Sequence, residues 1–174
     1  MTFTQNVTIP GGTEGNYYWM VRTNDRGEIY EGQNISNNAG FSLAQTTLSL
    51  PELQVGQTVN GAFTTVGSPI YYKIKPAVGT DVLVTLNGGG TTGWAQIFLG
   101  CGGAPTTQSS CASSPQWNVP VTSVPIDNAT GQWYYLMLSP MALPSSPASF
   151  TLNAQALNYS LGSPGWPAAA TPGA

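Results

Sequence analysis

Apolar and polar residues alternate in short runs along most of the chain. The clearest run is residues 71–75, where Tyr71, Lys73 and Lys75 alternate with Tyr72 and Ile74, the pattern of a strand with one buried face. A sustained 3.6-residue apolar period is absent, and 21 glycines and 14 prolines interrupt almost every window long enough for a helix. The pattern therefore predicts an all-β fold, of the sandwich or jelly-roll kind that short strands and frequent turns produce.

About eleven strands are predicted, in two groups separated by a turn at 37–40. The first group is a three-stranded meander at residues 3–9, 17–22 and 27–31. The second group comprises residues 41–50, 58–64, 69–75, 81–87, 94–99, 117–126, 132–139 and 149–158. We therefore expect a small meander unit over residues 1–40, a larger domain over 41–158, and a tail over 159–174 whose Pro, Ala and Gly content is typical of a linker.

The stretch 7–38 resembles the closing hairpins of CARDB domains, which are cell-adhesion-related, immunoglobulin-like sandwiches. The matching residues are Gly15, Tyr17, Tyr18, Asp25, Ile29 to Glu31, and Asn37 with Asn38. A complete sandwich of that type needs about seven strands and roughly 100 residues. The resemblance thus implies a partial Ig-like sandwich, which is either cut from a longer chain or completed by a second one.

Residues 48–158 resemble the pre-peptidase C-terminal (PPC) domain, a β jelly roll found beside secreted proteases and in surface proteins. Four motifs stand in the family's order: GQTVNG at 56–61, YYKI at 71–74, VLVTL at 82–86 and GQWYYL at 131–136. Some relatives bind calcium, but this chain lacks the acidic loop residues that many members carry. It also departs from the family in a long insertion at 100–116.

Charged residues make up only 6% of the chain, although 41% of the residues are hydrophobic and 10% are aromatic. A soluble domain usually has roughly 25% charged residues. Weakly charged surfaces favour association, so we expect identical copies to pack closely. A net charge of −3, with Arg22, Arg26, Lys73 and Lys75 as the cations, argues against nucleic acid as a partner. No apolar run has the roughly 20 residues of a membrane-spanning helix.

Cys101 and Cys111 enclose a loop rich in Gly, Pro, Ser and Thr, and we predict that they form a disulfide. The alternative is a pair of reduced thiols in a cytosolic protein. A metal site needs more ligands than two cysteines supply locally in a chain without histidine. The cysteines therefore favour an oxidising location, and the resemblance to CARDB domains implies that it is extracellular or on the cell surface of a bacterium or archaeon. Since residues 1–6 lack the basic and apolar regions of a signal peptide, we expect a mature or excised chain.

Candidate chemistry is sparse. The absence of histidine removes the usual base of serine and cysteine nucleophile systems. Seven carboxylates remain, and two suitably spaced ones are all that a glycosidase needs. Four of them lie in the N-terminal unit and the others at strand edges or turns, so we predict no enzymatic activity. Asn24, Asp25, Glu28 and Glu31 form either a calcium site or an ordinary polar turn, and no other cofactor is expected.

Aromatic residues often stand next to one another, and neighbours in a strand point to opposite faces. One member of each pair packs in the core, while the other faces solvent, a partner or a sugar. Candidates for an interface or for sugar stacking are Tyr18, Trp19, Tyr71, Trp94, Trp117 and Trp166.

Three functions remain open. The first is a structural subunit of an extracellular filament, sheath or surface layer, in which a neighbour's strands complete the N-terminal unit. The second is an accessory module of a larger secreted protease or adhesin, whose partners are neighbouring domains of a longer chain. The third is carbohydrate binding by the exposed aromatics.

Overall fold

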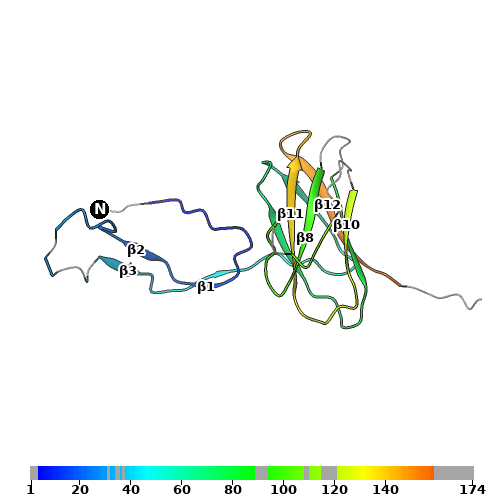
Figure 1. Ribbon diagram of the computed structural model, residues 1–174, viewed down its shortest axis with the longest axis horizontal. Coiled ribbons are helices and arrows are strands. Elements are labelled where there is room, and N and C mark those ends of the chain that lie inside the picture. Colours follow the sequence, from blue (N-terminus) through cyan, green and yellow to red (C-terminus); the bar gives the residue numbers. More distant parts are fainter. Residues whose placement is uncertain are drawn as a thin grey trace, which may run out of the picture.

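The computed structural model describes residues 4–30, 32–33, 36, 38–88, 94–107, 110–114 and 121–158, with the side chain of Trp94 left out. These residues form twelve β-strands and confirm the predicted all-β class. Eight strands build a sandwich, and four build a narrow ribbon that projects from it (Figure 1).

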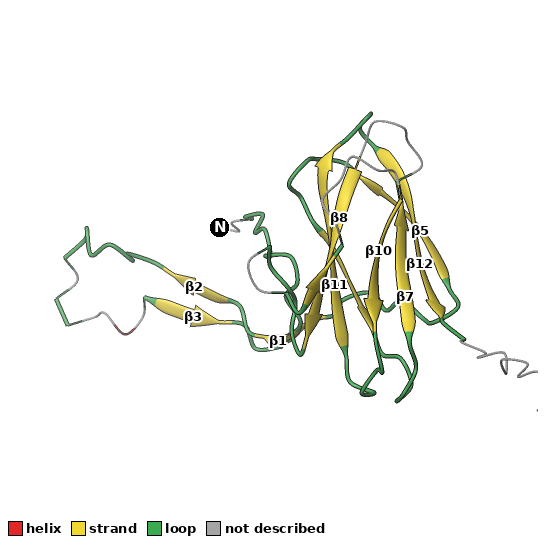
Figure 2. Cartoon of the chain, turned by 45° about the vertical axis from the view of Figure 1, so that its right-hand side comes forward, coloured by secondary structure: helices red, strands yellow, loops and turns green. Residues whose placement is uncertain are grey.

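The sandwich consists of two four-stranded antiparallel sheets (Figure 2). Sheet I has the order β10-β7-β12-β5, with bounds Val121–Ile126, Val82–Asn87, Ala148–Ala156 and Thr58–Phe63. Sheet II has the order β6-β11-β8-β9, with bounds Ile70–Ile74, Tyr134–Ala142, Trp94–Cys101 and Ala112–Ser113. Apart from β8 and β9, neighbouring strands in these orders are distant in sequence, so long-range pairing defines the fold.

The core lies between the two sheets and receives every second residue of most strands. Ile74, Val84, Leu136 and Leu152 have no solvent-exposed surface. Phe63 and Phe150 pack with their ring centroids 4.5 Å apart. Burying side chains of this size stabilises a fold by about 1.5–3 kcal/mol each.

The ribbon, called the arm below, spans residues 15–48. Strand β1 (Gly15–Tyr17) pairs with β4 (Thr46–Leu48), and β2 (Met20–Arg22) pairs with β3 (Ala39–Phe41). Between these ladders, residues 18–19 lie opposite residues 42–45, where the amide of Ser42 donates to the carbonyl of Trp19 at 2.8 Å. Both views show β1 next to the sandwich and the loop after β2 at the far end (Figures 1 and 2).

The predicted three-stranded meander is wrong in its pairing and in two of its strands. The described residues 4–9 and 27–30 form no strand. The predicted strand 17–22 contains the last residue of β1 and all of β2, and the region predicted as one strand from 41 to 50 contains the last residue of β3 and all of β4. The apolar residues Val7 and Ile9 of the first segment line a groove, and Ile29 and Tyr30 of the second segment are exposed to solvent.

Gly61 in β5 tests the packing of the sandwich. A Cβ added there would lie 2.4 Å from the ring of Phe150, and that ring is buried against Phe63. We expect Gly61→Ala to lower the free energy of unfolding by about 1–3 kcal/mol, the usual cost of overpacking. Gly40→Ala in β3 is the matched control, because a Cβ there meets nothing within 4 Å. Denaturant unfolding measures both, and equal effects would contradict this packing.

Candidate interaction surface

The arm exposes large apolar side chains along its whole length. Tyr30 is 95% exposed, Phe41 66% and Val21 68%. The other exposed apolar side chains of the arm are Tyr17, Tyr18, Trp19, Met20, Ile29 and Leu43. A two-stranded ribbon in water is marginally stable because it has no second layer to cover its apolar faces. Contiguous exposed apolar surface of this kind marks an interaction site.

At the base of the arm lies a groove of about 340 Å³. Its apolar walls are Val7, Ile9, Tyr17, Tyr18, Trp19 and Leu48, and three threonines and a proline complete the lining. Hydrogen bonds hold the rings in place: the Tyr17 hydroxyl donates to the carbonyl of Glu14 at 3.0 Å, and Trp19 Nε1 donates to Thr46 Oγ1 at 2.7 Å. The groove is therefore formed before any partner arrives.

Asn24 organises the far end of the arm. Its backbone has a φ of 49°, a left-handed conformation that asparagine tolerates well. Its side-chain amide donates from Nδ2 to the carbonyl of Ile29 at 2.7 Å, and its Oδ1 accepts from the amide of Ile29 at 3.0 Å. Residues 23–30, called the tip below, are thus closed by one side chain, while the side chains of Ile29 and Tyr30 face solvent.

Glu14 joins the arm to sheet II. Its carboxylate forms an ion pair with Lys73 of β6, accepts from the hydroxyl of Tyr135 of β11 at 3.3 Å, and bonds to the backbone of Leu50. The bond to Lys73 is the largest cause that lowers the pKa of Glu14 below its ordinary value of 4.5. Desolvation is the main cause that raises the pKa of Tyr135, and the charge of Glu14 adds to it. Tyr135 therefore stays a neutral donor.

Lys73 holds both ends of the arm. Its ammonium meets Glu14 on the outgoing side and lies 4.7 Å from the ring centroid of Trp133. On the returning side, its backbone amide donates to the carbonyl of Pro51 at 3.0 Å, and its carbonyl accepts from the amide of Leu53 at 2.8 Å. The arm leaves the sandwich and re-enters it against the same residue of β6.

The segment before β1 rests on the outer face of sheet II. A Cβ added to Gly11 would lie 2.5 Å from the ring of Tyr71, and one added to Gly12 would lie 2.8 Å from Cβ of Ala104. Such close approach requires glycine at both positions. Ala104 belongs to the loop between Cys101 and Cys111, so this loop, together with Tyr71, forms the surface on which the segment before β1 rests, called the footing of the arm below.

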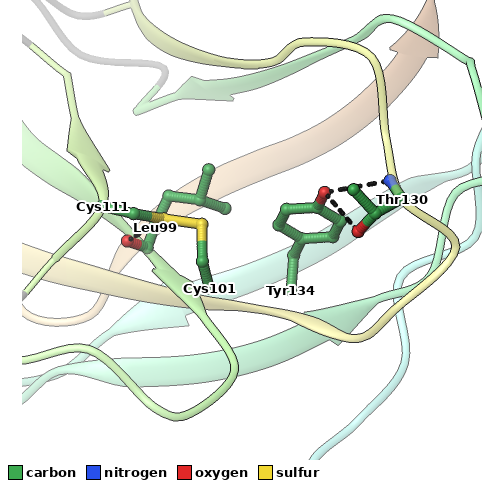
Figure 3. Close-up of a disulfide and its surroundings, with 5 residues drawn as sticks. All are labelled: Leu99, Cys101, Cys111, Thr130 and Tyr134. Atoms are coloured by element: carbon green, nitrogen blue, oxygen red, sulfur yellow. Dashed lines mark hydrogen bonds between the residues drawn. A yellow bond between two sulfur atoms is a disulfide. The ribbon is translucent and has the colours of Figure 1, made fainter.

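The predicted disulfide between Cys101 and Cys111 is formed, with a Cα–Cα distance of 5.9 Å (Figure 3). It links the end of β8 to the residue before β9, next to the carbonyl of Leu99. Across the ladder from Cys101, Tyr134 points its hydroxyl toward Thr130, where it accepts from the backbone amide at 3.2 Å.

The predicted calcium ligands are only partly brought together. The amide oxygen of Asn24 is bonded to Ile29, and Asp25 pairs with Arg22 at 3.1 Å. Glu28 is exposed, and Glu31 lies outside the described residues. In the part of the chain that the structure describes, no three His, Cys, Asp or Glu side chains lie close enough together to hold a metal ion. Calcium binding stays a prediction.

The six predicted contact aromatics separate. Tyr18 and Trp19 meet in the groove. Tyr71 instead packs within the chain beneath Gly11 and Gly12, and its hydroxyl donates to Sδ of Met137 at 3.2 Å. The side chain of Trp94, as well as Trp117 and Trp166, lies outside the described residues.

Sequence reasoning missed Glu14, Lys73 and Tyr135 as a joining cluster. Glu14 and Lys73 are 59 residues apart, and Glu14 and Tyr135 are 121 apart. The one signal in the sequence is the small number of charged residues, because a chain with four cations and seven carboxylates can form few ion pairs.

The described residues contain no helix of the length and hydropathy that a membrane crossing requires.

Comparison with known proteins yields matches among solved structures only. No protein family and no curated protein matches the chain. One similar structure is the pre-peptidase C-terminal domain of a collagenase from Bacillus anthracis, with 14% identity, a TM-score of 0.46, and coverage of 61% of this chain and 94% of that domain. Another is PliG of Aeromonas hydrophila, a periplasmic inhibitor of g-type lysozyme, with 15% identity, a TM-score of 0.42, and coverage of 61% and 97%.

The lowered pKa of Glu14 predicts that acid loosens the arm. Docking of the arm lowers the pKa of the Glu14 carboxyl group, so its ionised form stabilises the docked arm. This contribution is fully present at a pH above the ordinary pKa of 4.5, and it disappears as the pH falls through the lowered pKa. We expect segmental motion of the arm to increase between pH 5 and pH 2.

The measurement is the time-resolved anisotropy of a fluorophore on Gln33→Cys, at nanomolar concentration. Glu14→Gln should show the mobile arm already at pH 7 and a flatter pH profile. Glu28→Gln is the control, because Glu28 is an exposed carboxylate of the tip, and it should behave as the parent. An arm that stays rigid at pH 7 in Glu14→Gln would refute the role of this cluster.

The disulfide should stabilise both the sandwich and the footing of the arm. Removing a crosslink across a loop of this length costs about 2–3 kcal/mol in the chain-entropy model. We expect Cys101→Ser with Cys111→Ser to lower the free energy of unfolding by that amount and to increase arm motion, because Ala104 supports Gly12. Denaturant unfolding and the same anisotropy decay measure the two effects. A reductant should reproduce them in the parent and change nothing in the double variant.

Proposed function

We propose that this chain is a non-enzymatic extracellular structural protein that assembles with copies of itself, as a subunit or segment of a filament, sheath or surface layer. The arm is the assembling element. The observation that carries the proposal is the exposure of large apolar side chains on a ribbon that projects from a complete sandwich. A neighbouring chain that covers the arm removes this apolar surface from water, at roughly 25 cal/mol per Å² of apolar area.

Strand complementation is the mechanism we favour. Each strand of a two-stranded ribbon has one edge whose backbone groups lack a strand partner, and the described strands β1 to β4 pair only within the arm. Such edges accept a strand from another chain through backbone hydrogen bonds. The strand added would extend the arm into a wider sheet, which supplies the layer that the ribbon lacks.

The sandwich also suits close packing between copies. The outward-facing residues of sheet I carry no charge, and one row across it consists of Ser123, Thr85, Asn153 and Thr58. These side chains bond in pairs, with Thr85 Oγ1 and Ser123 Oγ 2.9 Å apart and Asn153 Nδ2 donating to Thr58 Oγ1 at 2.9 Å. An uncharged face with a hydrogen-bonded polar row allows lateral contact without electrostatic repulsion.

The disulfide supports an oxidising location, outside the cell or on the surface of a bacterium or archaeon. The ionised cluster of Glu14 and Lys73 has a mechanical task in the fold, and the chain lacks the histidine of common catalytic systems. A second candidate function is an accessory module of a larger secreted protease or adhesin, in which the arm would dock on a neighbouring domain of the same chain.

An assembly assay separates the two candidates. We expect the isolated chain to form oligomers whose size grows with concentration in sedimentation velocity. Val21→Asp with Phe41→Asp should weaken self-association by at least about tenfold, or ~1.4 kcal/mol, because both side chains are exposed on the arm. Val66→Asp is the control, since Val66 is exposed on the sandwich. A monomer at millimolar concentration would refute self-assembly and favour the accessory module.

A further inference from the structure

The groove at the base of the arm accepts a particular kind of occupant. None of its ten lining residues carries a charge. Three of the polar groups beside its apolar walls are bonded within the chain: Trp19 Nε1 to Thr46, the Tyr17 hydroxyl to Glu14, and Thr13 Oγ1 to the carbonyl of Pro10 at 2.6 Å. The other side-chain polar groups of the lining are the hydroxyls of Thr8 and Tyr18. An occupant that buries apolar surface and needs few hydrogen bonds fits this site.

These bonds weigh against a sugar. Sugar recognition combines aromatic stacking with hydrogen bonds to hydroxyl groups, and polar groups left unpaired on binding cost free energy. The groove offers rings, but it contains no carboxylate or amide side chain to receive the hydroxyl groups of a sugar. Aliphatic and aromatic side chains of a protein match its walls better.

The tip of the arm presents such side chains. Ile29 is 66% exposed and Tyr30 95% exposed. Asn24 bonds to both backbone groups of Ile29, so the backbone that carries these side chains is fixed before binding. Preorganisation lowers the conformational entropy lost on association. Of the charges in the tip, Asp25 pairs with Arg22 of β2 at 3.1 Å, and Arg26 and Glu28 are of opposite sign.

The tip and the groove lie at opposite ends of the arm. The groove is built on β1 and β4 next to the sandwich, whereas the tip follows β2 at the far end (Figures 1 and 2). A paired ribbon separates them, so the tip of a chain does not reach the groove of the same chain. A tip that occupies a groove therefore comes from another copy.

We propose that the groove formed by Val7, Ile9, Tyr17, Trp19 and Leu48 receives Ile29 and Tyr30 from the tip of a second copy. This inference rests on the proposed function and names the contact that gives the assembly its direction. The contact joins two different surfaces, so it is heterologous and continues from copy to copy unless the geometry closes. Each copy inside the assembly uses its tip once and its groove once.

Complementation between two defective variants tests the contact. The tip variant is Ile29→Asp with Tyr30→Asp, and the groove variant is Val7→Asp with Ile9→Asp; all four side chains are exposed, so the fold should persist. At a concentration where the parent assembles, each variant alone should be monomeric, with self-association at least tenfold weaker. A mixture should form a 1:1 heterodimer through the one intact tip and the one intact groove that remain, at a concentration where neither variant associates through its strand edges.

Fluorescence-detected sedimentation with one variant labelled measures the mixed species. A second measurement does not depend on these substitutions: copies with Tyr30→Cys mixed with copies carrying Val7→Cys should form a mixed disulfide on oxidation, and Val66→Cys in place of Val7→Cys should not.

The outcomes separate this inference from the proposed function. A parent that assembles while the mixture stays monomeric and the cysteines fail to crosslink would overturn the contact and leave assembly through the arm intact. A parent that forms only a closed dimer with working complementation would support the contact and overturn the filament. A monomeric parent would overturn both. A soluble oligosaccharide that binds the parent, fails to bind the groove variant and blocks heterodimer formation would assign the groove to sugars.

Discussion

A ribbon of two strands cannot cover its own side chains, and this constraint explains most of what is unusual in the molecule. The sandwich buries Ile74, Leu136 and Leu152 between two layers, whereas the arm has one layer and leaves Tyr30 and Phe41 in water. A domain that kept this arrangement as a monomer would expose apolar surface without compensation. In the assembly that we propose, the arm is half of an interface, with the groove at its base and the tip at its end as the two surfaces to be covered.

Both ion pairs of the described residues involve the arm or its junction with the sandwich. Glu14 and Lys73 join the arm to sheet II, and Arg22 of β2 pairs with Asp25 of the tip. The pair at the junction is shielded from solvent more than the exposed pair near the tip, so it is less weakened by salt and contributes more to positioning. On the outer face of sheet I, which has no charged residues, side chains of Ser, Thr and Asn form hydrogen bonds with one another.

The sandwich could be predicted well from the sequence, and the arm could not. Alternation at 58–64, 69–75 and 81–87 located β5, β6 and β7 to within one residue, because a strand with one buried face has alternating apolar and polar residues. The strands of the arm have no buried face that would impose this alternation. Their pairing depends on contacts such as the one between Trp19 and Thr46, which are far apart in sequence. The two hydrogen bonds from the side chain of Asn24 to the backbone of Ile29 could not be predicted. From the sequence alone, Asn24 fits either a calcium site or a polar turn, because both use the same residue types.

Lys73 connects the arm to the sandwich through its backbone as well as through its ion pair. Because its side chain holds Glu14 and its backbone holds Pro51 and Leu53, a pull on the arm reaches the sandwich by two routes that converge on one position of β6. From there, Lys73 pairs with Tyr135 of β11, which in turn pairs with Gly100 of β8. In the proposed assembly, tension between copies would thus spread across the hydrogen-bonded strands of sheet II and would not fall on a single connection.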